Sequence, residues 1–157
     1  MKNTQVFLKT ETDKKGIGID IFRVDNINMT PVLPFFLRAL AELMDNNHGY
    51  PSLDPEDLEN CGAIYAESNG KVLGHIVFNR KYISKEGYLW IQLSAVDPDC
   101  RGRGIYTILH KYFEDHAKEL GCWAIASHVR VTNETRLISA EKVGMKPIFY
   151  FMGKKLS

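Results

Sequence analysis

The chain has 157 residues, of which 45% are hydrophobic and 25% are charged, so it is long enough for one stable core. Its 20 Lys and Arg residues nearly balance 19 Asp and Glu residues, for a net charge of +1. Such a balance produces no global field that would attract nucleic acid or an acidic membrane. We therefore expect one soluble domain, residues 1–157, that binds neither.

The cysteines and the N-terminus indicate the compartment. Cys61, Cys100 and Cys122 form no C-x-x-C pair and are odd in number, which favours reduced thiols over a disulfide framework. Residues 1–4 lack the apolar segment of a signal peptide, and no apolar run is long enough to span a membrane. We expect a cytoplasmic protein.

The N-terminal half predicts strands with one long helix. Alternation of apolar and polar residues indicates the strands, and Thr30 followed by Pro31 is typical of a helix start with Thr30 as the N-cap. Asn69-Gly70 is a strong hairpin signal. In chain order we expect strands over 4–11 and 18–24, a helix from 31 to about 46, a short helix over 54–58, and strands over 62–68 and 71–80.

The most informative stretch runs from residue 89 to residue 120. An apolar strand over 89–96 leads through the turn 97–100 into the run Arg-Gly-Arg-Gly-Ile-Tyr at 101–106. An amphipathic helix over 104–120 follows. The next run, 122–129, then fits a strand parallel to the first, because a helix crossover connects the two.

The run at 101–106 predicts an anion cradle. Gly102 and Gly104 let the backbone turn tightly and approach a ligand closely. The first N–H groups of a helix have no partner within it, and the helix dipole adds positive potential at that end. Arg101 and Arg103 would add charge for a phosphate.

The order of strand, Val-Asp-Pro, Arg-Gly-x-Gly-Ile and helix resembles the coenzyme-A-binding motif of the GNAT acetyltransferases. A helix that starts near Asn133 and ends in Glu-Lys-Val-Gly-Met at 141–145 resembles the second half of the GNAT core. The resemblance implies an α/β fold with a mixed, mainly antiparallel sheet of six or seven strands and about four helices. A final strand is expected over 146–156, where the aromatic residues of 149–152 favour a homodimer contact.

The resemblance also implies acetyl-CoA as co-substrate, with its pyrophosphate in the cradle and its pantetheine arm along the strand 89–96. Asn133 would contact that arm or cap its own helix, and the two roles are compatible. The residues assigned to acetyl-CoA binding are Ala95, Val96, Arg101, Gly102, Arg103, Gly104, Ile105, Tyr106, Asn133 and Arg136.

Acetyl transfer to an amine needs a neutral amine, a donor for the tetrahedral oxyanion and usually an acid for the departing thiolate. The resemblance implies the backbone amide of Ala95 or Val96 as the oxyanion donor. Many family members carry a tyrosine that acts as the acid for the thiolate, at the position where this chain has Ala140. Ser139 is its neighbour, and Tyr106 stands at a position that is usually small in the family.

The expected strand 89–96 carries no carboxylate, so the identity of the general base is also undecided. Ser94 on that strand and His128 on the next are candidates, and so is His75 on the strand before. An ordinary imidazole titrates near 6.5, although either histidine also suits a purely structural role. The five histidines and three cysteines show no metal-ligand spacing, and we expect no metal.

These features favour an acetyl-CoA-dependent N-acetyltransferase that acts on a primary amine of a small molecule or peptide. The missing tyrosine favours a non-catalytic acyl-CoA-binding or sensing module as the alternative, and a dimeric scaffold is a third possibility. Antibiotics, polyamines, amino acids, peptide N-termini and lysine side chains all remain open as acceptors.

Overall fold

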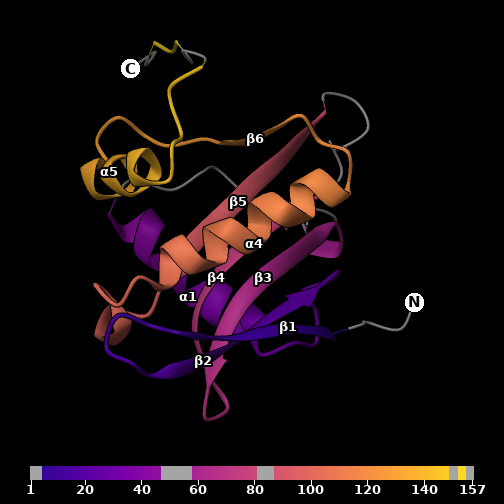
Figure 1. Cartoon of the computed structure of the whole chain (residues 1–157). Helices are drawn as coiled ribbons and strands as arrows, with labels where there is room; N and C mark the ends of the chain where they lie inside the picture. The colour runs from indigo at the N-terminus through magenta and orange to yellow at the C-terminus, as the bar shows by residue number, and fades with distance from the viewer. Residues whose placement is uncertain (1–4, 47–57, 81–86, 149–151, 155–157) are drawn as a thin grey trace.

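The computed structural model describes residues 5–46, 58–80, 87–148 and 152–154. Within them one six-stranded sheet has the spatial order β1-β2-β3-β4-β5-β6 (Figure 1). The strands are β1 (Gln5–Thr12), β2 (Gly18–Val24), β3 (Cys61–Ser68), β4 (Lys71–Asn79), β5 (Tyr88–Val96) and β6 (Ala124–Ser127). Neighbours are antiparallel except β5 and β6, which are parallel. The predicted mixed, mainly antiparallel α/β sheet is confirmed.

The described part of the chain holds three α-helices, against about four expected: α1 (Val32–Asp45), α4 (Ile105–Glu119) and α5 (Glu134–Lys142). A short 3-10 helix, η1 (Pro98–Cys100), follows β5. In Figure 1, α4 crosses the front of the sheet, α1 lies behind it and α5 lies beyond the end of β6. No described helix combines the length and apolar character that a membrane span requires. The helix expected over 54–58 falls almost entirely outside the described residues.

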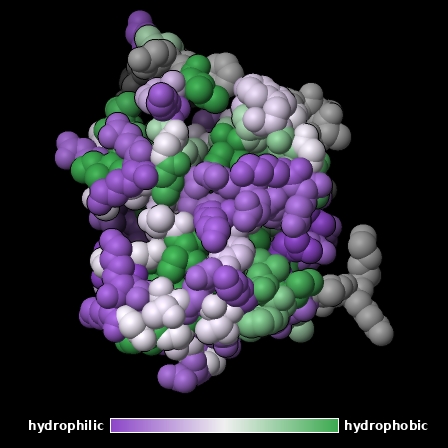
Figure 2. Space-filling model, viewed as in Figure 1, coloured by the Kyte–Doolittle hydropathy of each residue, from purple (hydrophilic) through white to green (hydrophobic). Residues whose placement is uncertain are grey.

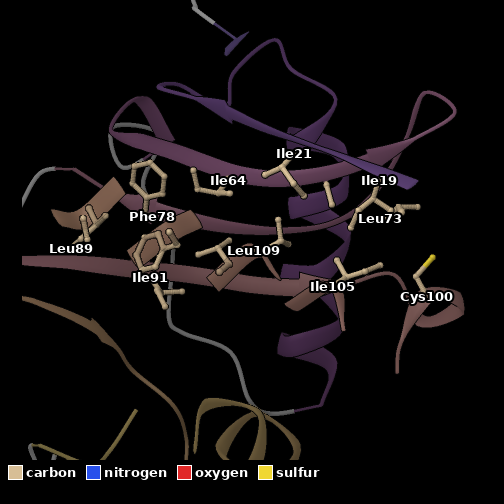
Figure 3. Packing of buried hydrophobic residues seen from close by; sticks show 14 residues of the cluster. Ile19, Ile21, Ile64, Leu73, Phe78, Leu89, Ile91, Cys100, Ile105 and Leu109 are labelled. Carbon is tan, nitrogen blue, oxygen red and sulfur yellow. The ribbon is translucent and has the colours of Figure 1, made fainter. Parts of the chain in front are cut away.

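Two hydrophobic clusters fill the two faces of the sheet. Because side chains alternate along a strand, Ile64 and Phe78 point to one face, where they pack with Leu109 of α4 (Figure 3). Val77 points to the other face and packs in the cluster that contains Phe36 of α1. Full burial of one such side chain stabilises the fold by roughly 1.5–3 kcal/mol. The sheet is therefore fixed by helices on both sides.

The outer face of α4 is polar, as its amphipathic pattern predicts. Lys111, Asp115 and Lys118 are exposed there, and Figure 2 shows a hydrophilic band across this face of the molecule. Gly121 follows the helix with φ +76°, in the left-handed region that favours glycine just after a helix end.

Two local predictions are wrong. Thr30 does not cap α1, because its hydroxyl donates to the Ile27 carbonyl at 2.6 Å and Pro31 takes the N-cap position without a side-chain cap bond. The strand expected over 146–156 is absent from its described residues, 146–148 and 152–154. The remaining residues of that segment lie outside the described part of the chain, so the homodimer remains a prediction.

Gly62 on β3 has no room for a side chain. A Cβ atom there would lie 2.7 Å from Cζ of Phe78 and 2.9 Å from the carbonyl oxygen of Val24. We expect Gly62→Ala to lower the free energy of unfolding by about 1–3 kcal/mol, measured by urea denaturation. Gly18→Ala is the matched control, because its Cβ would make only an ordinary contact of 3.8 Å with Thr10. Equal stability of the two variants would contradict this packing.

Candidate functional site

The site begins where β5 and β6 stop pairing. Their last shared pair is Ile91 with Ser127, and β5 then continues to Val96 beside β4 alone. The register with β4 shifts at this point and leaves Gln92 as an extra residue, which is a β-bulge. A bulge bends its strand, so the two parallel neighbours diverge here.

The divergence leaves backbone donors of β5 on an open side. The Asp97 N–H donates to the Leu73 carbonyl at the edge of β4, at 2.8 Å. Because donor directions alternate along an antiparallel strand, the Ala95 N–H also points toward β4. The N–H groups of Ser94 and Val96 point the other way, to the side that β6 has left.

A cavity of about 520 Å³ occupies this space, a volume typical of small-molecule sites. Its wall is built from β5 and the turn after it, the end of β6, the first turns of α5 and one face of α1. The predicted site residues that line it are Ser94, Ala95, Val96, Arg101, Tyr106, His128, Asn133 and Arg136. Gly102, Arg103, Gly104 and Ile105 do not line it, so the cradle adjoins the cavity through Arg101 and Tyr106.

The cradle has the backbone geometry that its sequence predicts. Gly102 has φ +78° and Gly104 has φ +79°, both in the left-handed region that favours glycine. A Cβ at Gly102 would meet no atom within 4 Å, so the space beside it is open. Gly104 is the N-cap residue of α4 and offers no side-chain cap, which leaves the first N–H groups of the helix available. Ile105 itself is a core residue, 1% exposed.

Arg103 is held by the turn between β1 and β2. Its Nε donates to the buried carboxylate of Asp13, and its Nη1 lies 3.3 Å from the Cys100 sulfur. The same carboxylate accepts the N–H groups of Lys15 at 2.8 Å and Ile17 at 2.9 Å. Burial raises the pKa of Asp13, but the hydrogen bonds from Ile17 and Arg103 outweigh it and hold that pKa below 3.8. Arg103 thus fixes the shape of the loop, whereas Arg101 is exposed.

Lys14 is a cation beside the cradle that sequence reasoning missed. Its N–H donates to the Arg103 carbonyl at 3.0 Å. Its side chain covers Gly104, since a Cβ there would lie 3.2 Å from Cε of Lys14. Nothing in the sequence signals this, because Lys14 lies about ninety positions away in an unremarkable turn.

Tyr106 and Arg136 form a stacked pair on the cavity wall. The Arg136 guanidinium lies 5.1 Å from the centre of the Tyr106 ring. The Tyr106 hydroxyl and both terminal nitrogens of Arg136 are buried and have no hydrogen-bond partner among the described residues. Burial raises the pKa of Tyr106, while the nearby Arg136 and Ser94 oppose the rise. The Asn133 side chain accepts the Arg136 backbone N–H at 3.2 Å, which confirms Asn133 as the cap of α5.

The candidate acids and bases differ in their access to the cavity. His75 is 0% exposed and does not line the cavity. Its ring centre lies 5.1 Å from that of Phe35, and burial lowers its pKa to about 3. His128 is exposed, lines the cavity and stacks on Trp90 at 4.8 Å. At the position of the family tyrosine, Ala140 is buried. Across the ranges that the structure describes, no three His, Cys, Asp or Glu side chains could hold a metal ion together.

Comparison with models of protein families identifies the family of this chain. The model of the acetyltransferase (GNAT) family matches residues 33–145. The chain therefore belongs to the GNAT acetyltransferases, as the motifs around Gly104 and Asn133 predict. A search of curated proteins found no match.

Solved structures share the fold. An aminoglycoside acetyltransferase from an uncultured soil metagenomic sample has a TM-score of 0.65 at 18% identity, over 90% of this chain and 100% of that one. The GNAT domain of PAT from S. lividans has a TM-score of 0.70 at 14% identity, over 92% of this chain and 90% of that one. AAC(6')-Iy in complex with the bisubstrate analog CoA-S-monomethyl-acetylneamine has a TM-score of 0.62 at 15% identity, over 87% of this chain and 99% of that one.

The Asp13 carboxylate predicts an acid-sensitive contribution to stability. Its folded pKa lies below 3.8, so the stabilisation is complete above that value and is lost as the pH falls through the lower, folded pKa. We expect Asp13→Asn to be less stable than the wild type in urea at pH 7, with the difference shrinking in acid. Asp20→Asn, which keeps an acceptor for the Thr10 hydroxyl, is the control and should change little. A difference that does not depend on pH would contradict the ionised contact.

Proposed function

We propose that the chain binds acetyl-CoA between the diverging strands and transfers the acetyl group to a primary amine. The observation that carries the proposal is the cavity where the pairing of β5 with β6 ends, beside the start of α4, whose N-cap residue Gly104 makes no side-chain cap hydrogen bond. A pyrophosphate suits the helix start and its two glycines, because N–H groups and the dipole both favour an anion there. Arg101 and Lys14 supply positive charge, and Arg103 keeps the loop in shape.

The pantetheine arm would lie along the open side of β5. Its amides would hydrogen-bond to the open edge of β5 as a neighbouring strand does in a sheet. Of the two predicted oxyanion donors, the alternation of N–H directions favours Val96 over Ala95, and it adds Ser94 as a second backbone donor. Preorganised donors of this kind stabilise the charge that develops on the carbonyl oxygen.

The amine has to lose a proton during the reaction. Of the two histidine candidates, His128 lines the cavity, as Ser94 also does, and its imidazole can take this proton directly or through water. His75 is unsuitable, because a buried imidazole with a pKa of about 3 accepts no proton near neutral pH. Part of the cavity wall comes from α1, where Phe35 and Leu43 are apolar and Arg38 and Glu42 are charged. We place the acceptor against this wall.

A thiol-release assay tests the proposal. Acetyl-CoA is incubated with aminoglycosides, polyamines, amino acids, peptides and lysine derivatives, and free CoA is measured. Release with at least one amine supports the transferase. Tight CoA binding without release across the panel would favour the acyl-CoA-binding module, and absence of CoA binding at millimolar concentration would end both.

Gly104 should matter more for CoA than for folding. Asn tolerates the left-handed region, so Gly104→Asn keeps the backbone while placing a side chain over the helix start. We expect its CoA affinity, measured by calorimetry, to fall by about tenfold or more, which corresponds to about 1.4 kcal/mol. Gly121→Asn is the matched control, because Gly121 has φ +76°, an open surrounding and lies at the other end of α4. A folded Gly104→Asn variant with unchanged affinity would refute the cradle.

A further inference from the structure

Arg38 places a positive charge on the part of the cavity wall that α1 supplies. Its Cζ atom lies 5.5 Å from the centre of the Phe35 ring, and both residues line the cavity. Attraction between the guanidinium and the ring holds the cation in place. Arg38 is exposed, and none of the ion pairs among the described residues includes it. Its donors are therefore available to a ligand in the cavity.

Arg38 is separate in the fold from the cradle that we assign to the pyrophosphate. The cradle lies at the start of α4, which crosses the front of the sheet, whereas α1 lies behind the sheet (Figure 1). Arg101 comes directly before the cradle and also lines the cavity. The pyrophosphate thus has its own cation, and Arg38 stands on the wall against which we place the acceptor.

The described lining of the cavity holds more cations than carboxylates. Its charged residues are Arg38, Arg101, Arg130, Arg136, Glu42 and Asp97. Asp97 is already compensated, because one of its oxygens lies 3.2 Å from Nζ of Lys71 and the other accepts the Asp99 N–H at 2.9 Å. Its pKa lies below the ordinary value, chiefly through that N–H, and the charges of Lys71 and Arg38 lower it further.

Glu42 does not cancel the charge of Arg38. The two residues stand four positions apart on α1, about 6 Å along the helix axis, and they form no ion pair with each other. A polycationic amine would therefore meet like charges along most of the described wall, which opposes its binding. An anionic group would find a cation that no described carboxylate neutralises.

We propose that the acceptor is a small amine that carries its own anionic group, a carboxylate or a phosphate, and that the Arg38 guanidinium binds this group. The inference rests on the proposed acetyl transfer and names the class of its acceptor. A guanidinium suits both anions, because its planar fork can donate two parallel hydrogen bonds to them. Amino acids and amino phosphates then fit the cavity, whereas aminoglycosides and polyamines do not.

The reaction leaves the anionic group unchanged. The amine nitrogen forms a bond to the carbonyl carbon, the C–S bond breaks and its electron pair goes to the sulfur. The nitrogen loses one proton and the sulfur gains one, so the products are an amide and the CoA thiol. Arg38 touches only the anionic end of the acceptor, so it acts in binding and the amino end stays available to the thioester beside β5.

The test compares amines that differ only in the anionic group. Glycine is paired with glycinamide, alanine with alaninamide and phosphoethanolamine with ethanolamine, and CoA release is measured. We expect kcat/KM of the wild type to be at least about tenfold higher for the anionic member of a pair. Glycinamide is a weaker base than glycine, so more of it is neutral near pH 7, and a preference for glycine has to come from binding. The two kinds of pair distinguish a carboxylate from a phosphate.

Arg38→Gln should remove this preference. We expect its KM for the anionic amine to rise about tenfold or more while KM for acetyl-CoA stays the same, and Arg38→Lys should restore part of the loss. Arg38 is exposed, so both variants should fold. Lys118→Gln is the charge-matched control, because Lys118 is exposed on α4 outside the cavity, and it should behave as wild type.

Calorimetry with the same amines gives a readout that needs no turnover, on the chain alone and on the chain saturated with CoA. Binding of the anionic amine to the wild type and its loss in Arg38→Gln would support the inference. Equal use of both members of every pair, faster turnover of aminoglycosides or polyamines, or an unchanged preference in Arg38→Gln would overturn it while leaving acetyl transfer intact. A wild type that binds no acetyl-CoA would overturn both proposals.

Discussion

The parallel pairing of β5 with β6 is the constraint on which the site depends. It lasts for four residue pairs and ends at Ile91 and Ser127. One edge of β5 stays paired with β4 from Trp90 to Val96, apart from the bulge at Gln92, so it is the other edge that opens. The bulge at Gln92 bends β5 where β6 departs, and α4 connects the two strands across the face of the sheet (Figure 1). A longer parallel ladder would satisfy the same backbone groups internally and leave no cavity.

Local chemistry made most of the fold predictable. Asn69 has φ 50° and Gly70 has φ 75°, the positive values that the Asn-Gly hairpin signal demands. The cap at Asn133 and the stop at Gly121 also depend only on nearby residues. The strand expected over 146–156 is absent from its described residues, 146–148 and 152–154. Whether an apolar segment joins a sheet depends on a free sheet edge, which is a long-range feature that local sequence does not specify. Ile148, in the expected strand, is exposed.

The candidate site was predictable on its β5–α4 side and hidden elsewhere. The glycines of the cradle predict positive φ, and every helix start offers N–H groups whatever its side chains are. By contrast, the contact of Asp13 with Arg103 joins residues ninety positions apart, and α1 supplies a cavity wall that its amphipathic pattern presents only as core. Arg101 and Arg103 look equivalent in sequence but differ in the structure. Arg103 is paired with the buried carboxylate of Asp13, whereas Arg101 is exposed at the cavity.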